Sequence, residues 1–341
     1  MAARRTGIKD VAREAGVSVG TVSNVLNHPE IVAESTRRRA LDVIGSTGCV
    51  RAEGPRQLQG LAARVIAVLG LDSADPHFTA LTTGVEQAAR KADVGVMVCT
   101  GARDLAEEAR HLALITSHQV RGAVLMSGDG VGRTVAAFRR HAVSFVMADQ
   151  CTPQPAACSV GVDDVAGGHA AVRHLLAQGH RSVVCVGGPE RLAPIRDRRT
   201  GARIAVSRSG FPSVSLHELS CLELTVSAGR DAGQRILGMP ARPTAAFRAD
   251  DLLALGVIQA LYEAGLKVPE DIAMVGYGDL AFAASAVVPL TTVRRPTVAM
   301  GRQAGRLLIE DTAHGARHEH ARVVRQPELV ARRSTLSGPA R

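Results

Sequence analysis

The sequence has almost no aromatic side chains. Tryptophan is absent, and aromatic residues make up only 2% of the 341 residues. Proteins that bind single-stranded nucleic acid stack the bases on aromatic rings, so this composition argues against that class of partner. The hydrophobic core must therefore be built from Ala, Val, Leu and Ile.

Cysteines are few and scattered, at positions 49, 99, 151, 158, 185 and 221. No Cys-x-x-Cys pair occurs, and no set of Cys and His has the spacing of zinc ligands, so we expect neither a metal site nor a cofactor. The sequence also has no apolar signal segment after Met1 and no apolar run long enough to cross a bilayer. These absences predict a cytoplasmic protein with reduced cysteines and no membrane partner.

The charge balance is basic, with a net charge of +9 at pH 7. A basic balance favours polyanionic partners but says nothing about specificity. The Arg residues are spread over the whole chain rather than gathered in one stripe. A chain of 341 residues is too long for one small core, so we predict two or three domains.

The segment from Ile8 to Asn27 has the pattern of two short helices joined by a tight turn. Apolar residues recur at helical spacing up to Ala15, and Gly16 follows where a chain leaving a helix often needs a positive φ. Ser18 stands where a hydroxyl can cap the next helix. This pattern predicts a helix-turn-helix whose second helix enters a DNA major groove, with an ordinary helical hairpin as the alternative.

The same segment closely resembles the DNA-binding headpiece of the lactose-repressor (LacI/GalR) family of bacterial transcription regulators. The matching residues are Ile8-Lys9-Asp10-Val11-Ala12, Ala15-Gly16-Val17-Ser18, Thr21-Val22-Ser23 and Val25-Leu26-Asn27. The resemblance implies an all-α headpiece over residues 1–48. It also implies that a homodimer binds a pseudo-palindromic operator in double-stranded DNA.

The exposed side chains at the start of the second helix are expected to face the bases. Asn24 stands where many relatives carry Arg, and Asn prefers a bidentate contact to adenine. Gly20 has no side chain and Val19 can contact only a thymine methyl, so we expect an operator that departs from the usual family half-site. Thr21 and Ser23 are expected to contact phosphate, with simple capping as the alternative. The predicted DNA-binding set is Ser18, Val19, Gly20, Thr21, Ser23, Asn24, Asn27, Arg56 and Leu58.

Residues 49–62 have the composition of a hinge or linker. In the family this segment forms a short helix that inserts a leucine into the minor groove, and Leu58 aligns with that leucine. The family's Gly-Tyr-Arg-Pro-Asn is replaced here by Gly48-Cys49-Val50-Arg51-Ala52, and Pro55 precedes Arg56. Pro55 suits the first position of a shortened helix but can also prevent one, so both outcomes stay open for Leu58.

From Arg64 onward, apolar runs of strand length alternate with segments of helical periodicity. This βαβ pattern predicts parallel sheets with helices on both faces, in two lobes separated by a cleft. We place the α/β core at residues 63–341, with a first lobe at 63–160 and 291–319 and a second lobe at 161–290 and 320–332. The expected strands are 65–71, 94–99, 122–126, 143–147, 182–186, 213–219, 244–247 and 272–276.

The core resembles the two-lobed periplasmic-binding-protein-like fold that the same family carries. The motifs behind this resemblance run in order through nearly the whole chain and include Asp75-Pro76-His77-Phe78, Gly187-Gly188-Pro189 and Val275-Gly276-Tyr277. The resemblance implies that Asp149 and Arg198 form a polar pair that holds the hydroxyls or carboxylates of a small-molecule effector. Its full implied effector set is Phe78, Asp149, Arg198, Asp250, Asp279 and Arg295.

Three departures concern the effector, expected to be a sugar or a related metabolite. Asp250-Asp251 replaces the Asn-Asp of many sugar-binding relatives, and Gly278-Asp279 replaces their Asp-Asp. Leu224 stands where an aromatic ring often stacks on a sugar. We therefore hypothesise that the effector is not a simple neutral hexose, or that it is held differently.

Three functions compete. A ligand-responsive transcription regulator, expected to be a repressor, accounts for both the headpiece and the core. A solute-binding protein would need export, which the missing signal segment argues against. An α/β enzyme fused to a DNA-binding domain would need a catalytic set of side chains, and none emerges, so we predict no enzyme. The tail after Arg332 has no leucine heptads, which predicts a dimer without a coiled-coil tetramer.

Overall fold

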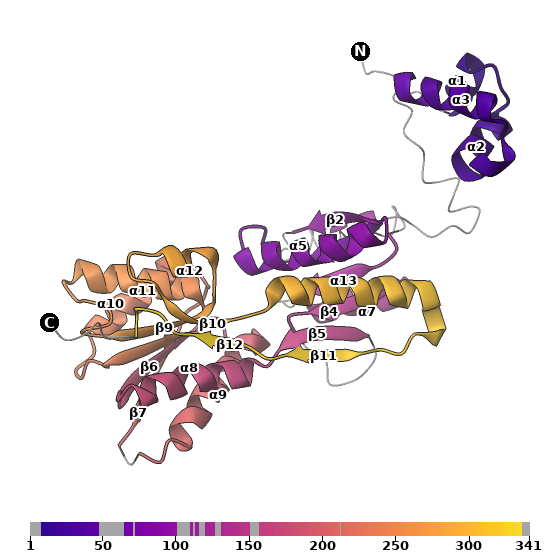
Figure 1. Cartoon of the computed structure of the whole chain (residues 1–341). Coiled ribbons are helices and arrows are strands. Elements are labelled where there is room, and N and C mark those ends of the chain that lie inside the picture. Colours follow the sequence, from indigo (N-terminus) through magenta and orange to yellow (C-terminus); the bar gives the residue numbers. More distant parts are fainter. Residues whose placement is uncertain are drawn as a thin grey trace. The chain divides into compact units, whose positions relative to one another are not determined.

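The computed structural model describes residues 8–47, 65–70, 72–100, 110–111, 113–115, 120–126, 131–150, 157–211 and 213–335. The chain divides into two compact units, residues 1–63 and 64–341, and each is described here by itself (Figure 1). The predicted hinge, with Arg56 and Leu58, lies outside the described residues. None of the described helices is both long enough and apolar enough to cross a membrane.

The headpiece is helical, as predicted, with α1 at Ile8–Glu14, α2 at Val19–Asn27, η1 at Pro29–Ile31 and α3 at Glu34–Thr47. Gly16 has the positive φ of +63° expected for the turn. The Ser18 hydroxyl caps α2 by accepting the Thr21 N–H at 2.9 Å. Small apolar side chains from α1, α2 and α3 close the core: Val11, Ala12, Ala15, Val22, Val25 and Ala40 are buried.

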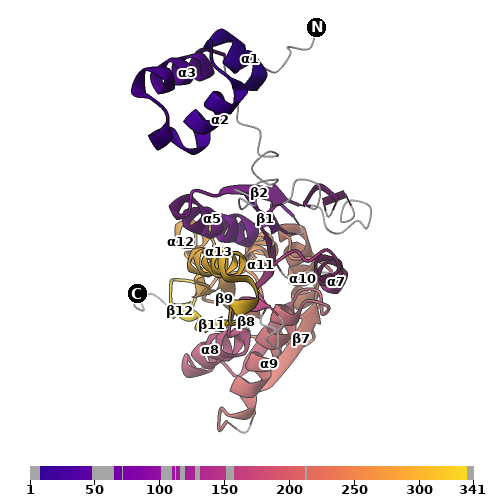
Figure 2. The ribbon, with the colours of Figure 1, turned by 90° about the vertical axis from the view of Figure 1, so that its right-hand side faces the viewer.

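The first lobe is a six-stranded parallel sheet in the order β11-β5-β4-β3-β1-β2. Helices α5 and α13 lie side by side over one face of this sheet (Figures 1 and 2), and α7 packs on the other face through Phe138. The strands are β1 Val65–Leu69, β2 Gly95–Cys99, β3 Ala123–Met126, β4 Phe145–Ala148, β5 Cys158–Val162 and β11 Arg322–Arg325. The helices are α5 Pro76–Lys91, α7 Val131–Arg140 and α13 Thr297–His314, and the short η2 spans Gly315–Arg317.

The second lobe repeats this plan in the order β12-β10-β9-β8-β6-β7, with β12 antiparallel to β10. Helices α8 and α9 cover one face of the sheet, and α10 and α11 cover the other (Figure 1). The strands are β6 Ser182–Gly187, β7 Ser215–Ser220, β8 Ala245–Arg248, β9 Ala273–Gly278, β10 Thr291–Arg294 and β12 Glu328–Val330. The helices are α8 Asp164–Ala177, α9 Ala193–Ser207, α10 Val226–Leu237, α11 Asp251–Glu263 and α12 Ala281–Ser285.

Two strands join the opposite lobe from the one expected. β10 was assigned to the first lobe but pairs with β9 in the second sheet, whereas β11 was assigned to the second lobe but pairs with β5 in the first. Both strands are only 4 residues long. A short apolar run shows that a strand exists without showing which sheet it joins, because the pairing depends on distant residues.

Glycines allow the main helix pairs to pack closely. A Cβ on Gly84 of α5 would overlap the Val298 carbonyl of α13, and one on Gly301 would overlap the Leu81 carbonyl. The other two pairs have the same reciprocal arrangement, through Gly168 and Gly201 for α8 and α9, and through Gly229 and Gly256 for α10 and α11. Backbone contact of this kind lets each helix pair pack closely without large side chains between the two backbones.

Candidate functional sites

The start of α2 presents the side chains predicted to read DNA. Ser18, Val19 and Gly20 are exposed, and 42% of Val19 is accessible. Val22 and Val25 are buried on the opposite face. The helix therefore separates an outer face from a core face, as a recognition helix requires.

The hydroxyls of Ser18 and Thr21 lie 2.8 Å apart, and the Thr21 N–H donates to Ser18, so Thr21 takes part in the cap of α2. A hydroxyl group can make more than one hydrogen bond, and phosphate contact by Thr21 and Ser23 stays a prediction. Asn24 is partly exposed. The Asn27 side chain lies outside the described residues, as do Arg56 and Leu58.

A cavity of about 290 Å³ lies between the two lobes of the core, at the carboxyl ends of their strands. Ligands of open α/β sheets bind at this end of the strands. Side chains from both lobes line it, with contributions from the crossover between β10 and α13. The lining includes Asp72, Asp75, His77, Met126, Asp149, Arg191, Ile195, Arg198, Leu222, Glu223, Leu224, Asp250, Leu252 and Arg295.

Arg198 is fixed on the second-lobe wall of the cavity. Its Nε donates to Asp164 Oδ1 at 2.8 Å and its Nη1 donates to the Ala249 carbonyl at 2.7 Å. The guanidinium carbon lies 4.0 Å from the centroid of the Tyr277 ring. Burial acts to lower the pKa of Arg198, but the negative charge of Asp164 and its hydrogen bond act in the opposite direction, and the pKa is raised. This guanidinium is charged and held in place.

Asp149 and Arg295 form a buried ion pair on the first-lobe side. Asp149 directly follows β4 and has a φ of +71°, in the left-handed region that Asp tolerates better than most residues. Arg295 lies on the crossover from β10 to α13. Burial lowers the pKa of Arg295 to about 10, while Asp75 acts in the opposite direction, so Arg295 stays charged at neutral pH.

His77 and Asp250 face each other across the cavity floor, with His77 Nε2 at 3.5 Å from Asp250 Oδ2. Burial and the charge of Arg295 lower the pKa of His77 to about 3, although Asp75 opposes them, so this histidine is neutral and the contact is not an ion pair. Burial raises the pKa of Asp250 to about 6, although the hydrogen bond from the Leu252 N–H and the charge of Arg198 act to lower it. Among the described residues, His77 Nε2 and Arg295 Nε find no hydrogen-bond partner.

The residues that differ from those of sugar-binding relatives have different roles in the structure. Asp250 lines the cavity, and its Oδ1 also accepts the Leu252 N–H at the start of α11. Asp251 has a structural role instead, because it accepts the Thr292 hydroxyl at 2.7 Å and the Leu280 N–H at 2.8 Å. Leu224 lines the cavity and packs over Gly188, where a Cβ would overlap it.

Two predicted effector contacts are corrected. Phe78 is buried in the first-lobe core beneath Gly70 and does not line the cavity. Asp279 also lies outside the lining, since its carboxylate accepts Arg294 Nε and Arg332 Nη2, each at 2.7 Å. His77 and Asp164 were missed. His77 precedes Phe78 in the same motif. Asp164 belongs to Val162-Asp163-Asp164, another motif of the family resemblance, but its contact with Arg198, 34 residues away, has no local signal.

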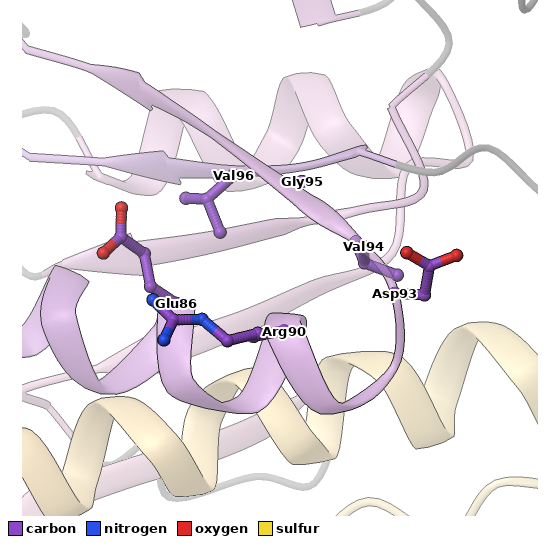
Figure 3. A pocket seen from close by; sticks show the side chains of 6 residues that line it. All are labelled: Glu86, Arg90, Asp93, Val94, Gly95 and Val96. Carbon is purple, nitrogen blue, oxygen red and sulfur yellow. The ribbon is translucent and has the colours of Figure 1, made fainter.

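A second hollow, of about 480 Å³, lies on the first lobe away from the cavity. Figure 3 shows Glu86 and Arg90 projecting from α5 beside Val96 of β2, with Asp93 in the connecting turn. β2 is the outermost strand of its sheet. The hollow therefore lies at an edge of the lobe, where β2 begins, and not at the carboxyl ends of the strands.

Comparisons with known proteins identify the family. Residues 7–48 match "Bacterial regulatory proteins, lacI family", and residues 172–335 match "Periplasmic binding protein-like domain". The HTH-type transcriptional regulator DegA of Bacillus subtilis is 30% identical to this chain over 97% of its length and 98% of DegA. This chain belongs to the LacI family. The transcriptional repressor CytR of Escherichia coli is likewise 30% identical over 97% of each chain.

Solved structures of LacI-family proteins share the fold. A lac repressor dimer bound to operator and an anti-inducer has a TM-score of 0.84 at 24% identity, covering 98% of this chain and 100% of that chain. The complex of the regulator CelR with cellobiose has a TM-score of 0.71 at 28% identity, covering 97% and 100%. The predicted fold is confirmed: a helix-turn-helix headpiece and a two-lobed α/β core. The protein is a DNA-binding transcription regulator of the repressor type with an effector-binding core.

Proposed function

We propose that the cavity between the lobes binds the effector through Asp149, Arg198, Asp250 and Arg295, with His77 in place of Phe78. The observation that carries this proposal is the pair of buried polar atoms, His77 Nε2 and Arg295 Nε, that lack partners among the described residues. Buried polar groups are almost always hydrogen-bonded, so a polar ligand in this cavity would complete the site.

The effector is a small polar metabolite carrying hydroxyls or carboxylates. The lining alternates buried cations and carboxylates, which suits a ligand with several hydrogen-bonding groups. A cavity of about 290 Å³ has room for a molecule of monosaccharide size. Leu224 supplies no flat ring for stacking, which supports the hypothesis that a simple neutral hexose is not the effector.

Effector binding is coupled to DNA binding through the lobes. The connections between the lobes follow β5, β10 and β11, and Arg295 lies on the second of them. A ligand that contacts both walls therefore favours one relative position of the lobes. Control of DNA binding requires that the effector bind the DNA-bound and free states with different affinities.

Calorimetric titration of the whole protein with a panel of sugars, sugar acids and related metabolites tests the effector proposal. We expect a polar metabolite to bind, with the affinity of Arg295→Met reduced at least tenfold and that of the exposed control Arg306→Met unchanged. Equal binding by Arg295→Met would contradict the assigned site. Tight binding of a common neutral hexose would overturn the effector hypothesis alone.

The operator site is α2 from Ser18 to Asn24, acting with the predicted contacts Asn27, Arg56 and Leu58. Its support is the exposed outer face of α2 and the match of residues 7–48 to the LacI family. Selection of bound fragments from the source genome, with the whole chain and with residues 1–62 deleted, tests it. Enrichment of one palindromic motif that disappears on deletion is expected; the same motif from the deleted protein would contradict the assignment.

The chain regulates transcription without catalysing a reaction, and it acts in the cytoplasm. The support for both statements is the identity of its relatives, which are transcriptional regulators and repressors. A turnover assay on each metabolite that binds the cavity tests the first statement. Conversion of a bound metabolite at a rate that depends on Asp250 would overturn it.

The operator is bound by a homodimer that uses the edge of the first lobe at β2. Val98 of β2 is 48% exposed, and Glu86 and Arg90 place opposite charges one helical turn apart, which is self-complementary across a two-fold axis. Val98→Asp is expected to shift the dimer toward monomer in sedimentation. Val324→Asp is the matched control, because Val324 is 42% exposed on β11 at the opposite edge. Equal effects of both changes would place the interface elsewhere.

A further inference from the structure

Three side chains that are distant in the sequence converge where β5 and β11 begin. Cys158 is the first residue of β5, and His318 and His320 precede β11. Because these strands are parallel neighbours, the segment before β11 lies beside the start of β5. Cys158 Sγ lies 3.1 Å from His318 Nε2 and 3.8 Å from His320 Nδ1. All three ligand atoms are within 4.8 Å of one another.

The extended backbone places the side chains of both histidines on the same side of the segment. His318 has extended dihedral angles, with φ −78° and ψ 126°. In an extended segment, residues two apart project to the same side. His318 and His320 therefore face Cys158 together, with ring centroids 5.6 Å apart and planes at 66°.

The distances suit a tetrahedral metal ion. Zinc binds sulfur at about 2.3 Å and imidazole nitrogen at about 2.0–2.1 Å, which places S and N about 3.5 Å apart at a tetrahedral angle. The observed S···N separations of 3.1 Å and 3.8 Å lie on either side of this value. Shifts of a few tenths of an ångström would bring both nitrogens into coordination distance.

The surroundings of the sulfur supply a hydrogen-bond donor to it and negative charge for a bound cation. Cys158 is buried, and its sulfur accepts the backbone N–H of Ala321 at 3.4 Å. Hydrogen bonds of this kind stabilise ligated thiolates. Glu310 and Asp311 of α13 add negative charge close to the sulfur. A thiolate with two imidazoles selects a transition metal, since Mg²⁺ and Ca²⁺ require oxygen ligands.

We propose that Cys158, His318 and His320 form a three-ligand site for a transition-metal dication of the zinc class, with a fourth position open to solvent beside the exposed His320. This site lies at the opposite end of the first sheet from the effector cavity, because β5 begins at Cys158 and the cavity lies at the carboxyl ends of the strands. It is therefore independent of the effector proposal. Sequence spacing could not show it, since 160 residues separate Cys158 from His318.

Titration of the chelator-treated whole protein with Co²⁺ tests the site. Tetrahedral Co²⁺ bound to a thiolate absorbs through sulfur-to-cobalt charge transfer and through intense visible bands. We expect both features to saturate at one Co²⁺ per chain and to disappear when Zn²⁺ is added. Competition with a chromophoric chelator then gives the Zn²⁺ affinity, and Zn²⁺ should raise the thermal midpoint of the wild type.

Variants decide whether these residues are the ligands. Cys158→Ser should abolish the charge-transfer band, and His318→Gln and His320→Gln should each weaken Zn²⁺ binding at least tenfold. His320 is exposed, so His320→Gln should keep the metal-free thermal midpoint and remain informative if Cys158→Ser fails to fold. Cys185→Ser and His141→Gln are controls outside the cluster and should bind as the wild type does.

Three results would overturn the proposal. Absence of a saturable charge-transfer band in the wild type would mean that Cys158 and His318 form only a hydrogen bond. A band of full intensity in His320→Gln and His318→Gln, with unchanged Zn²⁺ affinity, would mean that the histidines are not ligands, and a band that survives in Cys158→Ser would mean that another cysteine binds the metal.

Discussion

In α2 the side chains proposed to read DNA stand on an exposed face, with 42% of Val19 accessible, whereas the cavity buries the side chains proposed to hold the effector. Only 3% of Arg198 and 6% of Arg295 are accessible. An exposed side chain can change with little effect on folding. A buried charge is part of the core and of the binding site together, so its loss affects both.

Arg198→Met should give the largest effect, because it leaves the Asp164 carboxylate buried without its cation. Breaking a buried pair in this way costs about 3–5 kcal/mol of unfolding free energy. Urea unfolding of the core measures it. The control is Arg203→Met, whose ion pair with Glu218 is on the surface and contributes less than about 1 kcal/mol. Equal losses for the two variants would remove the distinction between buried and exposed sites.

His77 should make the stability of the core depend on pH. Its pKa is about 3 in the folded protein and 6.5 when exposed, so below pH 6.5 the unfolded chain takes up a proton that the folded chain does not. Stability is therefore lost as the pH falls from 6.5 toward 3, by up to about 1.4 kcal/mol per pH unit.

The measurement is the difference in unfolding free energy between wild type and His77→Gln at pH 7, 6 and 5. Buried Asp250 has a raised pKa and acts in the opposite direction, but it is present in both proteins and largely cancels. His141→Gln, at an exposed position, is the control for replacing a histidine by glutamine outside the cavity. A flat difference for His77→Gln would mean that His77 is not held neutral.

Asn24→Ala should act on DNA binding and leave folding intact. Loss of a bidentate base contact weakens specific binding by about 1–3 kcal/mol. Stability should change by less than about 0.5 kcal/mol, because the side chain is on the outer face. Fluorescence anisotropy with the selected operator and a scrambled duplex at one salt concentration tests this. Equal weakening on both duplexes would assign Asn24 to phosphate contact.

Gly20→Ala should give the smallest effect and a favourable one. A Cβ there would meet only Ser18 Oγ, at 3.6 Å, which is ordinary contact. Replacing Gly by Ala within a helix stabilises it by about 0.5–1 kcal/mol. The change in headpiece stability is measured by thermal unfolding of the whole protein, with a signal that reports on the headpiece. Gly16→Ala is the contrasting variant and should destabilise the headpiece, since Gly16 has φ +63°.

The headpiece could be predicted closely from the sequence because its signals are local. The turn at Gly16 and the cap at Ser18 each depend on neighbouring residues. In the core, every predicted strand was found. The sequence did not predict β5, which contains Ser159 and Gly161 and lacks a continuous apolar run. The lobe of β10 and β11 could not be predicted, because pairing is decided across the fold.

The cavity was predictable in part. Asp149 and Arg198 were placed by family resemblance, and the structure brings both to the lining. Asp164 lies in a motif of the family resemblance, but its contact with Arg198 could not be predicted, because no local pattern joins a helix start to a side chain on the next helix. Asp279 was misplaced because its sequence neighbourhood does not show the two arginines that engage it.

The reciprocal glycines of the three main helix pairs have a consequence for genetic variation. Gly84 and Gly301, like their counterparts in the second lobe, lie outside α2 and outside the cavity lining, yet every added side chain there would displace backbone. In a scan of all single substitutions, these positions should score as inactive alongside the cavity residues. Loss of activity on substitution would therefore identify both packing positions and effector-binding positions in this regulator. Only a measurement of stability would distinguish the two.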